Sequence, residues 1–182
     1  MSLRSERFSY VAEETAGRTL DIGCGPHNRF VTEWIEDGIG IDVYQYDGLA
    51  EDQIVSDMTR LPFGASSFDS VTLIAALNHI PRPLRDPQLA EMQRVLRPGG
   101  RIIITMGTAF AESAVHRLVH FYSERFKTHE DMDHERGMEE DEDYSITKSE
   151  ILERLRRTGF VGVRQRRIWT QFGLNKLYIA VK

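Results

Sequence analysis

The sequence predicts an α/β fold, with a parallel sheet that carries helices on both faces. Short β-branched or apolar runs alternate with segments of helical period through most of the 182 residues, which is typical of βαβ units. The composition, 41% hydrophobic and 28% charged, suits a globular domain with its own core. The chain has no internal repeat and no long linker, so we expect residues 1–182 to form a single domain.

The expected elements follow from these two periods and from their boundary residues. Strands are expected at 18–22, 38–41, 53–55, 68–75, 101–106, 162–168 and 176–181. Helices are expected at 4–16, 28–36, 87–96, 109–127 and 148–158. The proline and glycines of 97–100 mark a stop before a strand, and Thr147 with Glu150 forms a capping box that opens a helix.

Two segments do not fit this alternation of strands and helices, one at the amino terminus and one that is strongly acidic. The first helix follows no strand, so we expect residues 1–17 to cap the sheet edge or a ligand site. Residues 128–145 have neither period and are expected to form an acidic loop or a lid. The net charge of −5 is uneven, because 130–143 carries nine acids against Arg136, whereas 154–167 carries six arginines and no acid. Such runs are usually solvated faces; the alternative makes the arginines a nucleic-acid footprint and the acids its gate.

The cysteine content and the apolar runs indicate a compartment. The single cysteine, Cys24, excludes an internal disulfide framework and any zinc site with several cysteines. No apolar run approaches the ~18 residues that cross a bilayer, and residues 1–10 lack the apolar block of a secretory signal. We therefore expect a cytoplasmic, soluble protein with no membrane partner.

The first strand runs directly into a turn with Gly23 and Gly25, where a backbone without Cβ atoms can approach a ligand closely. Asp42 comes 21 residues after Asp21, at the carboxyl end of the next strand, where an acid can accept both hydroxyls of a ribose. A pyrophosphate cofactor would favour glycine in place of Asn28, and Asp21 would repel its phosphates. The pattern therefore predicts a nucleoside ligand without phosphates.

Five sequence motifs follow one another along the chain. They are the acid and alternate glycines of 21–25, Val-Ser-Asp-Met at 55–58, Leu-Pro-Phe at 61–63 with Ser-Phe-Asp-Ser-Val at 67–71, Leu-Asn-His-Ile at 77–80, and Leu-Arg-Pro-Gly-Gly at 96–100. Together they resemble the class I S-adenosylmethionine-dependent methyltransferase family, in its small-molecule branch. The resemblance covers about 19–106 and is weaker in 149–160 and the last strand. It implies a Rossmann-like, mostly parallel sheet of seven strands, with helices on both faces and the last strand antiparallel beside the fifth.

The resemblance also implies roles for single residues of the glycine turn. The cofactor S-adenosylmethionine would lie across the carboxyl ends of strands one to four, with its methionine part along Asp21, Gly23 and Gly25. One departure concerns this end of the cofactor. His27 stands where the family often has a third glycine, which affects how the loop closes over the methionine carboxylate.

The adenosine part of the cofactor would contact the next two motifs. By the same resemblance Asp42 would bind the ribose. Asp57 would accept a hydrogen bond from the exocyclic amine of adenine, and Met58 would pack on the ring. For Asp57 the alternative is a turn or helix cap, which aspartate commonly provides.

Methyl transfer from a sulfonium mainly requires alignment of the acceptor and exclusion of water, so a base is optional. For a hydroxyl acceptor the candidate base is His79, beside Asn78 and just after the fourth strand. The alternative is a histidine that hydrogen-bonds the loop backbone. The motif of amino-methylating relatives is missing from Ala-Ala-Leu-Asn at 75–78. We therefore expect a small-molecule acceptor with a reactive oxygen, carbon, sulfur or aliphatic nitrogen, and we do not expect nucleic acid.

Two sets of reactive side chains have simpler explanations than chemistry. Cys24, between the glycines, is interpreted as a small packing residue and not as a nucleophile. A group of histidines and acids could suggest a metal, but no third ligand has a matching spacing and a helix surface explains the first pair. No metal is therefore expected at these residues, which are His116, His120, His129, Asp131, Asp133 and His134.

Other functions stay open at this level. A non-catalytic S-adenosylmethionine-binding protein would keep Asp42 and the glycines but close the acceptor pocket. A nucleic-acid methyltransferase would use the arginines of 154–167 and bind with steep salt dependence. A nicotinamide oxidoreductase is disfavoured by Asn28 and Asp21. The sequence gives no signal for an oligomeric state.

Overall fold

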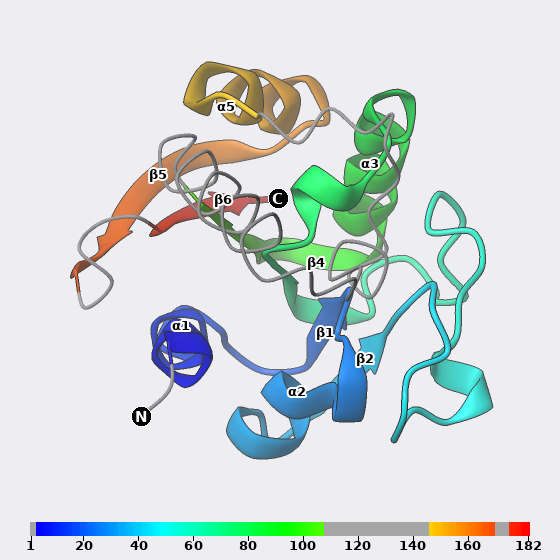
Figure 1. Ribbon diagram of the computed structural model, residues 1–182. Coiled ribbons are helices and arrows are strands. Elements are labelled where there is room, and N and C mark those ends of the chain that lie inside the picture. Colours follow the sequence, from blue (N-terminus) through cyan, green and yellow to red (C-terminus); the bar gives the residue numbers. More distant parts are fainter. Residues whose placement is uncertain (1–2, 108–145, 170–174) are drawn as a thin grey trace, which may run out of the picture.

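A twisted sheet with helices on both faces forms the part of the chain that the structure describes. The computed structural model describes residues 3–107, 146–169 and 175–182. Its strands are β1 (Thr19–Ile22), β2 (Gly38–Ile41), β3 (Phe68–Ile74), β4 (Leu96–Gly107), β5 (Val161–Ile168) and β6 (Asn175–Val181). Its longer helices are α1 (Leu3–Ala12), α2 (Arg29–Trp34), α3 (Arg85–Val95) and α5 (Lys148–Arg157). Figure 1 shows α3 and α5 on one side of the sheet and α1 and α2 on the other.

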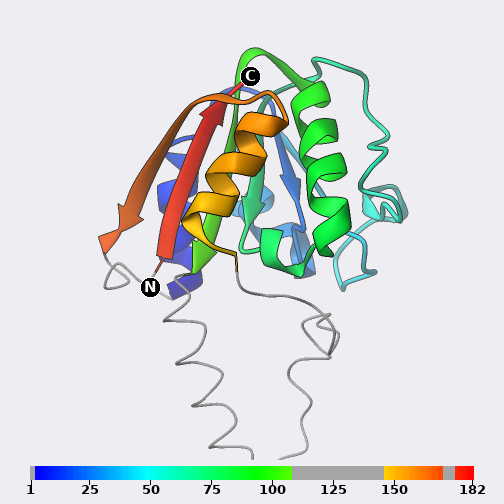
Figure 2. The same ribbon diagram turned by 90° about the horizontal axis from the view of Figure 1, so that it is seen from above.

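The strand order is β2-β1-β3-β4-β6-β5. The first four strands in this order pair in parallel. The last strand, β6, runs antiparallel to both β4 and β5 and lies between them, as the red arrow in Figure 2 shows. The fifth expected strand, at 101–106, is part of β4. The expectation that the last strand is antiparallel and lies beside it is therefore confirmed.

The described residues form six strands rather than the seven expected, because the strand predicted at 53–55 does not form. Residues Glu51–Gln53 make one turn of 3₁₀ helix instead, and only a single parallel bridge joins Asp42 to Ile54. The Gln53 side chain explains the difference. Its Nε2 donates to the Gly40 carbonyl at 2.8 Å and its Oε1 accepts from the Ala50 amide at 3.0 Å, so a side chain takes bonds that a strand would form with its backbone.

The two faces of the sheet carry two separate cores, because alternate residues of a strand point to opposite faces. On one face, Ile102 and Ile104 of β4 pack with α3 and α5. On the other face, Ile103 of β4 and Leu177 and Ile179 of β6 pack with α1 and α2. The helix residues of this second core are Phe8, Val11, Phe30 and Val31.

Helix α1 packs on a sheet face rather than across the sheet edge, which is one of the two places expected for it. The helix lies on a sheet face, where the rings of Phe8 and Phe30 are 5.4 Å apart. It ends at Ala12 rather than at residue 16. The helix also contacts the edge strand β5, where the Arg166 guanidinium lies over the Tyr10 ring at 5.0 Å, and the residue Glu13 after the helix pairs with Arg166 at 2.8 Å.

The C-terminal helix α5 begins as its boundary residues predict. Thr147 Oγ1 accepts from the Glu150 amide at 3.2 Å, which is one half of the expected capping box. None of the described helices is long and apolar enough to cross a membrane. The helix expected at 109–127 and the acidic segment 128–145 lie outside the described residues.

Candidate cofactor and acceptor site

A cavity of about 440 Å³ opens at the carboxyl ends of β1, β2 and β3. This is the edge at which open α/β sheets bind their ligands. The structure brings nearly all of the predicted site residues together on its wall. They are Gly23, Gly25, Asp42, Asp57, Met58 and His79. The exception is Asp21, which lines a smaller cavity that adjoins the first.

The glycine turn needs glycine for two different reasons. Gly23 has φ +74°, and a Cβ there would lie 2.9 Å from the Ala76 Cβ. Gly25 has φ 65° and ψ −170°, a region that only glycine adopts readily, and the space where its Cβ would lie is open. The turn is held on β2, since the amides of Gly23 and Cys24 both donate to the Ile41 carbonyl. The sequence thus produces an open backbone cradle at the cavity wall.

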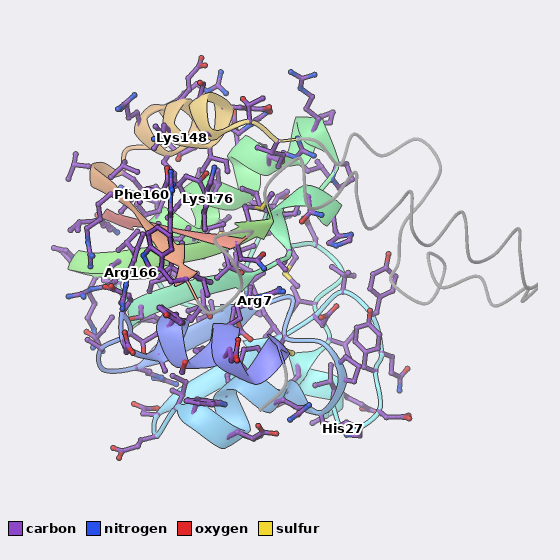
Figure 3. All side chains as sticks on the ribbon, turned by 60° about the vertical axis from the view of Figure 1, so that its left-hand side comes forward. Arg7, His27, Lys148, Phe160, Arg166 and Lys176 are labelled. Atoms are coloured by element: carbon purple, nitrogen blue, oxygen red, sulfur yellow. The ribbon has the colours of Figure 1, made fainter. Side chains whose placement is uncertain are left out.

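His27 and Asn28 continue the turn in left-handed conformations, with φ 61° and 47°. The amide of His27 donates to the Asp47 carbonyl at 2.8 Å, and its ring lies against Gly48. Figure 3 shows His27 in the loop beside α2, and it is not among the residues that line the two cavities. The third position of the turn is therefore one that favours glycine, and this chain fills it with a histidine that points outward.

Asp42 follows directly after β2 and is 5% exposed. Its Oδ2 accepts from the Gly25 amide at 2.9 Å, and its Oδ1 accepts from the Tyr44 amide at 3.1 Å. The carboxylate thus fixes the glycine turn while facing the cavity. Both bonds are charge-assisted, which makes them stronger than bonds between neutral groups.

Asp57 and Met58 form the next part of the wall. Asp57 Oδ1 accepts from the amide of Thr59 at 2.9 Å and from its hydroxyl at 2.6 Å, and these bonds hold the pKa of Asp57 below its usual value. The turn cap considered for Asp57 is therefore present, on a residue that also faces the cavity. Met58 is 5% exposed and gives the wall an apolar surface.

His79 ends a 3₁₀ turn, Leu77–His79, after β3. The buried side chain of Arg85 on α3 binds the backbone of this loop. Arg85 is 1% exposed, and its Nε donates to the Ile80 carbonyl at 2.8 Å while its Nη2 lies 3.4 Å from the Asn78 carbonyl. Glu150 of α5 lies 3.7 Å from Arg85 Nη1. The two carbonyls that flank His79 are therefore tied to α3 and, through Glu150, to α5.

Asp21 and Cys24 have pKa values that burial raises. Asp21 is 1% exposed, and burial raises its pKa to about 7 although the Thr72 hydroxyl donates to it at 2.6 Å. Burial, together with the charges of Asp21 and Asp42, raises the pKa of Cys24 to about 12. The Cys24 thiol therefore stays protonated, which suits a packing role and not a nucleophile.

Sequence reasoning missed part of the cavity wall. Tyr44 lies only two residues after Asp42, the acid proposed for the ribose. Its position in the sequence could therefore have identified it as part of the cavity wall. No local signal marks Leu84 and Gln88, which reach the cavity because α3 and the turn before it fold against β3. Tyr44 and Leu84 are 48% and 42% exposed, so the mouth of the cavity is partly apolar.

The arginines of 154–167 are mostly engaged within the fold. Arg154 is 6% exposed and pairs with Asp86 at 2.6 Å and with Glu150 at 2.8 Å. Arg157 also pairs with Asp86, and Arg164 and Arg166 pair with Glu14. Four of the six arginines thus have acidic partners, and these partners lie on α3, on α5 and after α1.

The described residues contain no group of three histidine, cysteine or acidic side chains that could hold a metal ion. The histidines and acids considered for a metal, His116 to His134, lie outside those residues.

Comparison with known proteins adds independent evidence. Residues 20–104 match the family described as a methyltransferase domain. A demethylmenaquinone methyltransferase from Beutenbergia cavernae is 36% identical over 75 residues, which are 41% of this chain and 30% of that protein. A solved SAM-dependent methyltransferase from Methanosarcina mazei has a TM-score of 0.65 at 22% identity, over 94% of this chain and 96% of the other. The 1,6-didemethyltoxoflavin-N1-methyltransferase of Burkholderia thailandensis has a TM-score of 0.61 at 18% identity, over 99% and 77%.

The sheet order and the cavity at its carboxyl edge are those of a Rossmann-like fold. Residues 20–104 are thus similar to a methyltransferase domain, and the fold of the chain is similar to that of solved SAM-dependent methyltransferases. The matched segments cover between 21% and 36% of the curated relatives' own lengths.

Proposed function

We propose that the protein is an S-adenosylmethionine-dependent methyltransferase that acts on a small-molecule acceptor. One observation carries the proposal: a single cavity of about 440 Å³ collects the glycine turn, the acid after β2, the Asp57-Met58 pair and His79. These residues come from four separate parts of the chain. The relative from Beutenbergia cavernae, named a demethylmenaquinone methyltransferase, supports a small-molecule acceptor.

The residues present fit this cofactor. The open space at Gly25, where a Cβ would meet no atom within 4 Å, is a cradle for a ligand. Asp42 and Asp57 offer carboxylates to ribose hydroxyls and to an adenine amine, and Met58 offers an apolar surface to the ring. When bound, S-adenosylmethionine supplies a methyl group on a sulfonium for in-line transfer.

His79 would accept the proton of a hydroxyl acceptor, because it faces the cavity from a loop that Arg85 fixes on both sides of it. An imidazole titrates near neutral pH, so it can act as a base there. The apolar wall, to which Ile80 and Leu84 contribute, would limit water around the reacting atoms. With an amine or a carbon acceptor His79 would instead orient the acceptor.

The cavity is also the feature that a non-catalytic cofactor-binding protein on this fold would share. The mouth of the cavity supports a methyltransferase over a non-catalytic protein, because Tyr44 and Leu84 leave exposed apolar surface there, beside the proposed cofactor residues, on which a methyl acceptor can bind.

The nucleic-acid alternative loses its main support, since four of the six arginines in 154–167 are paired with acids of the fold. We propose that the protein is cytoplasmic. The unpaired thiol of Cys24 agrees with that reducing compartment.

The test is methyl transfer from S-adenosylmethionine labelled on the methyl carbon to a panel of phenols, quinols, thiols and aliphatic amines. We expect label in at least one acceptor class, and slower turnover in His79→Gln with nearly unchanged cofactor affinity. Label that appears only in RNA or DNA, or cofactor binding without transfer to any acceptor, would contradict the proposed function. Equal rates for wild type and His79→Gln would return His79 to a structural role.

A further inference from the structure

Gln88 of α3 is a buried polar side chain on the wall of the larger cavity. It is only 7% exposed, and it lines the cavity beside Leu84 of the preceding turn. Its amide forms no hydrogen bond with any other residue in the part of the chain that the structure describes. An amide that is removed from water without a partner is unfavourable. The partner of this amide must therefore come from the cavity.

The position of Gln88 on α3 makes a polar side chain there unexpected. The buried residues of this helix are Arg85, Gln88, Leu89, Met92 and Val95. Leu89, Met92 and Val95 belong to the core between α3, α5 and the sheet, so the helical spacing favours an apolar residue at position 88 as well. Glutamine is mostly an exposed residue in proteins. Its burial on this face indicates that the amide has a role in the cavity.

Arg85 fixes the start of α3 to the loop that carries His79. It lies one helical turn before Gln88, and its guanidinium binds the carbonyls of Asn78 and Ile80, on both sides of His79. His79 and Gln88 line the same cavity. The helix and the loop are thus joined by a buried side chain, which sets the place of the Gln88 amide relative to the candidate base.

The chemistry of the cavity restricts the group that Gln88 can bind. Ile80 and Leu84 surround it with apolar wall. None of the described residues that line this cavity is a lysine or an arginine, whereas Asp42 and Asp57 are acids. Such a wall disfavours an anionic group, and a primary amide can both donate and accept a hydrogen bond. An uncharged oxygen, in a hydroxyl or a carbonyl group, therefore fits best.

We propose that Gln88 determines acceptor specificity, because its amide hydrogen-bonds an uncharged oxygen of the acceptor that does not itself take the methyl group. The inference rests on the proposed function and narrows its acceptor class. The acceptor carries no anionic group and has a second oxygen in addition to its reacting atom. The residues proposed for the cofactor lie in 21–25, 42 and 57–58, and Gln88 belongs to none of these segments.

The experiment compares acceptors that differ only by a hydroxyl in place of a methyl group. The pairs are the three dihydroxybenzenes with the matching cresols, 2-mercaptoethanol with 1-propanethiol, and ethanolamine with 1-propylamine. For the wild type we expect kcat/KM to favour the hydroxyl member of at least one pair at least about tenfold, because the methyl analogue leaves the buried amide unpaired. Gln88→Met keeps the length of the side chain and removes the amide, so this preference should fall to within about twofold.

The matched control is Gln93→Met, because Gln93 lies on the same helix but does not line the cavity. This variant should keep the full preference. Calorimetry with S-adenosylhomocysteine provides a second measurement, in which both variants should bind within about twofold of the wild type.

Equal kcat/KM values within every pair for the wild type would overturn the inference. A Gln88→Met variant that keeps the preference would also overturn it, and so would one that loses affinity for S-adenosylhomocysteine, because Gln88 would then belong to the cofactor site. A wild type that binds S-adenosylhomocysteine but transfers no methyl group to any acceptor would instead overturn the proposed function.

Discussion

The backbone amide of Gly25 donates to the carboxylate of Asp42 at 2.9 Å. The two residues are 17 positions apart and belong to two different motifs, the glycine turn after β1 and the acid after β2. Their bond joins the turn proposed for the methionine part of the cofactor to the acid proposed for its ribose. The parallel pairing of β1 with β2 is what brings them within reach.

Replacement of Asp42 should therefore weaken cofactor binding. Asp42→Ala removes the acceptor proposed for two ribose hydroxyls, and it also releases the amides of Gly25 and Tyr44. We expect at least about a tenfold loss in affinity for S-adenosylhomocysteine, since each charge-assisted bond contributes about 1.5–3 kcal/mol. Calorimetry measures it, with Asp52→Asn, an exposed acid outside the cavity, as the control. Unchanged affinity in Asp42→Ala would exclude the ribose assignment.

The stability of the protein should depend on the ionisation of Asp21. Burial raises its pKa to about 7, whereas an unfolded aspartate titrates near ~4. Between these two values the folded state binds more protons than the unfolded state, so the free energy of unfolding falls as pH rises through this window. Asp21→Asn removes this titration and keeps an acceptor for Thr72.

Urea unfolding at a series of pH values checks this prediction. The wild type should lose stability relative to Asp21→Asn from about pH 4 to about pH 7, and the difference should stay constant above that range. Parallel curves for the two proteins across this range would show that Asp21 has an ordinary pKa.

The buried guanidinium of Arg85 should contribute strongly to stability. Arg85→Met leaves the carbonyls of Asn78 and Ile80 without their donor and Glu150 with one cation fewer. We expect a loss of about 3 kcal/mol, which is typical when one partner of a buried pair is removed. Arg157→Met, which breaks an exposed pair with Asp86, should cost less than about 1 kcal/mol. Denaturant unfolding of both variants gives the comparison, and equal losses would contradict a special role for Arg85.

The glycine turn should respond differently to substitution at positions 25 and 27. Gly25→Ala forces a side chain into the φ 65°, ψ −170° region, at a cost on the order of 1–3 kcal/mol. His27→Gly relieves a left-handed conformation with φ 61° and should leave the protein about as stable as the wild type. Thermal unfolding distinguishes them. A Gly25→Ala variant as stable as His27→Gly would mean that the turn relaxes without cost.

Local patterns predicted most of the sheet and six of the residues that line the larger cavity. The strands are short apolar runs, and Gly25 and Asp42 stand at motif positions whose geometry follows from parallel pairing. The prediction of a strand at 53–55 is wrong, because the Gln53 side chain bonds to the Gly40 carbonyl, a contact that the local sequence pattern does not reveal. Gln88 reaches the cavity only because α3 folds against β3, which depends on contacts distant in sequence.

The most direct test of the central claim is a calorimetric titration of the wild type with S-adenosylhomocysteine, the product that any methyl transfer from the proposed cofactor leaves behind. The residues of the cavity predict one site per chain with a dissociation constant in the micromolar range, equivalent to about −8 kcal/mol. Binding should weaken at least about tenfold in Asp42→Ala and keep its affinity in Asp52→Asn. A wild type that binds no S-adenosylhomocysteine at millimolar concentration would contradict the account.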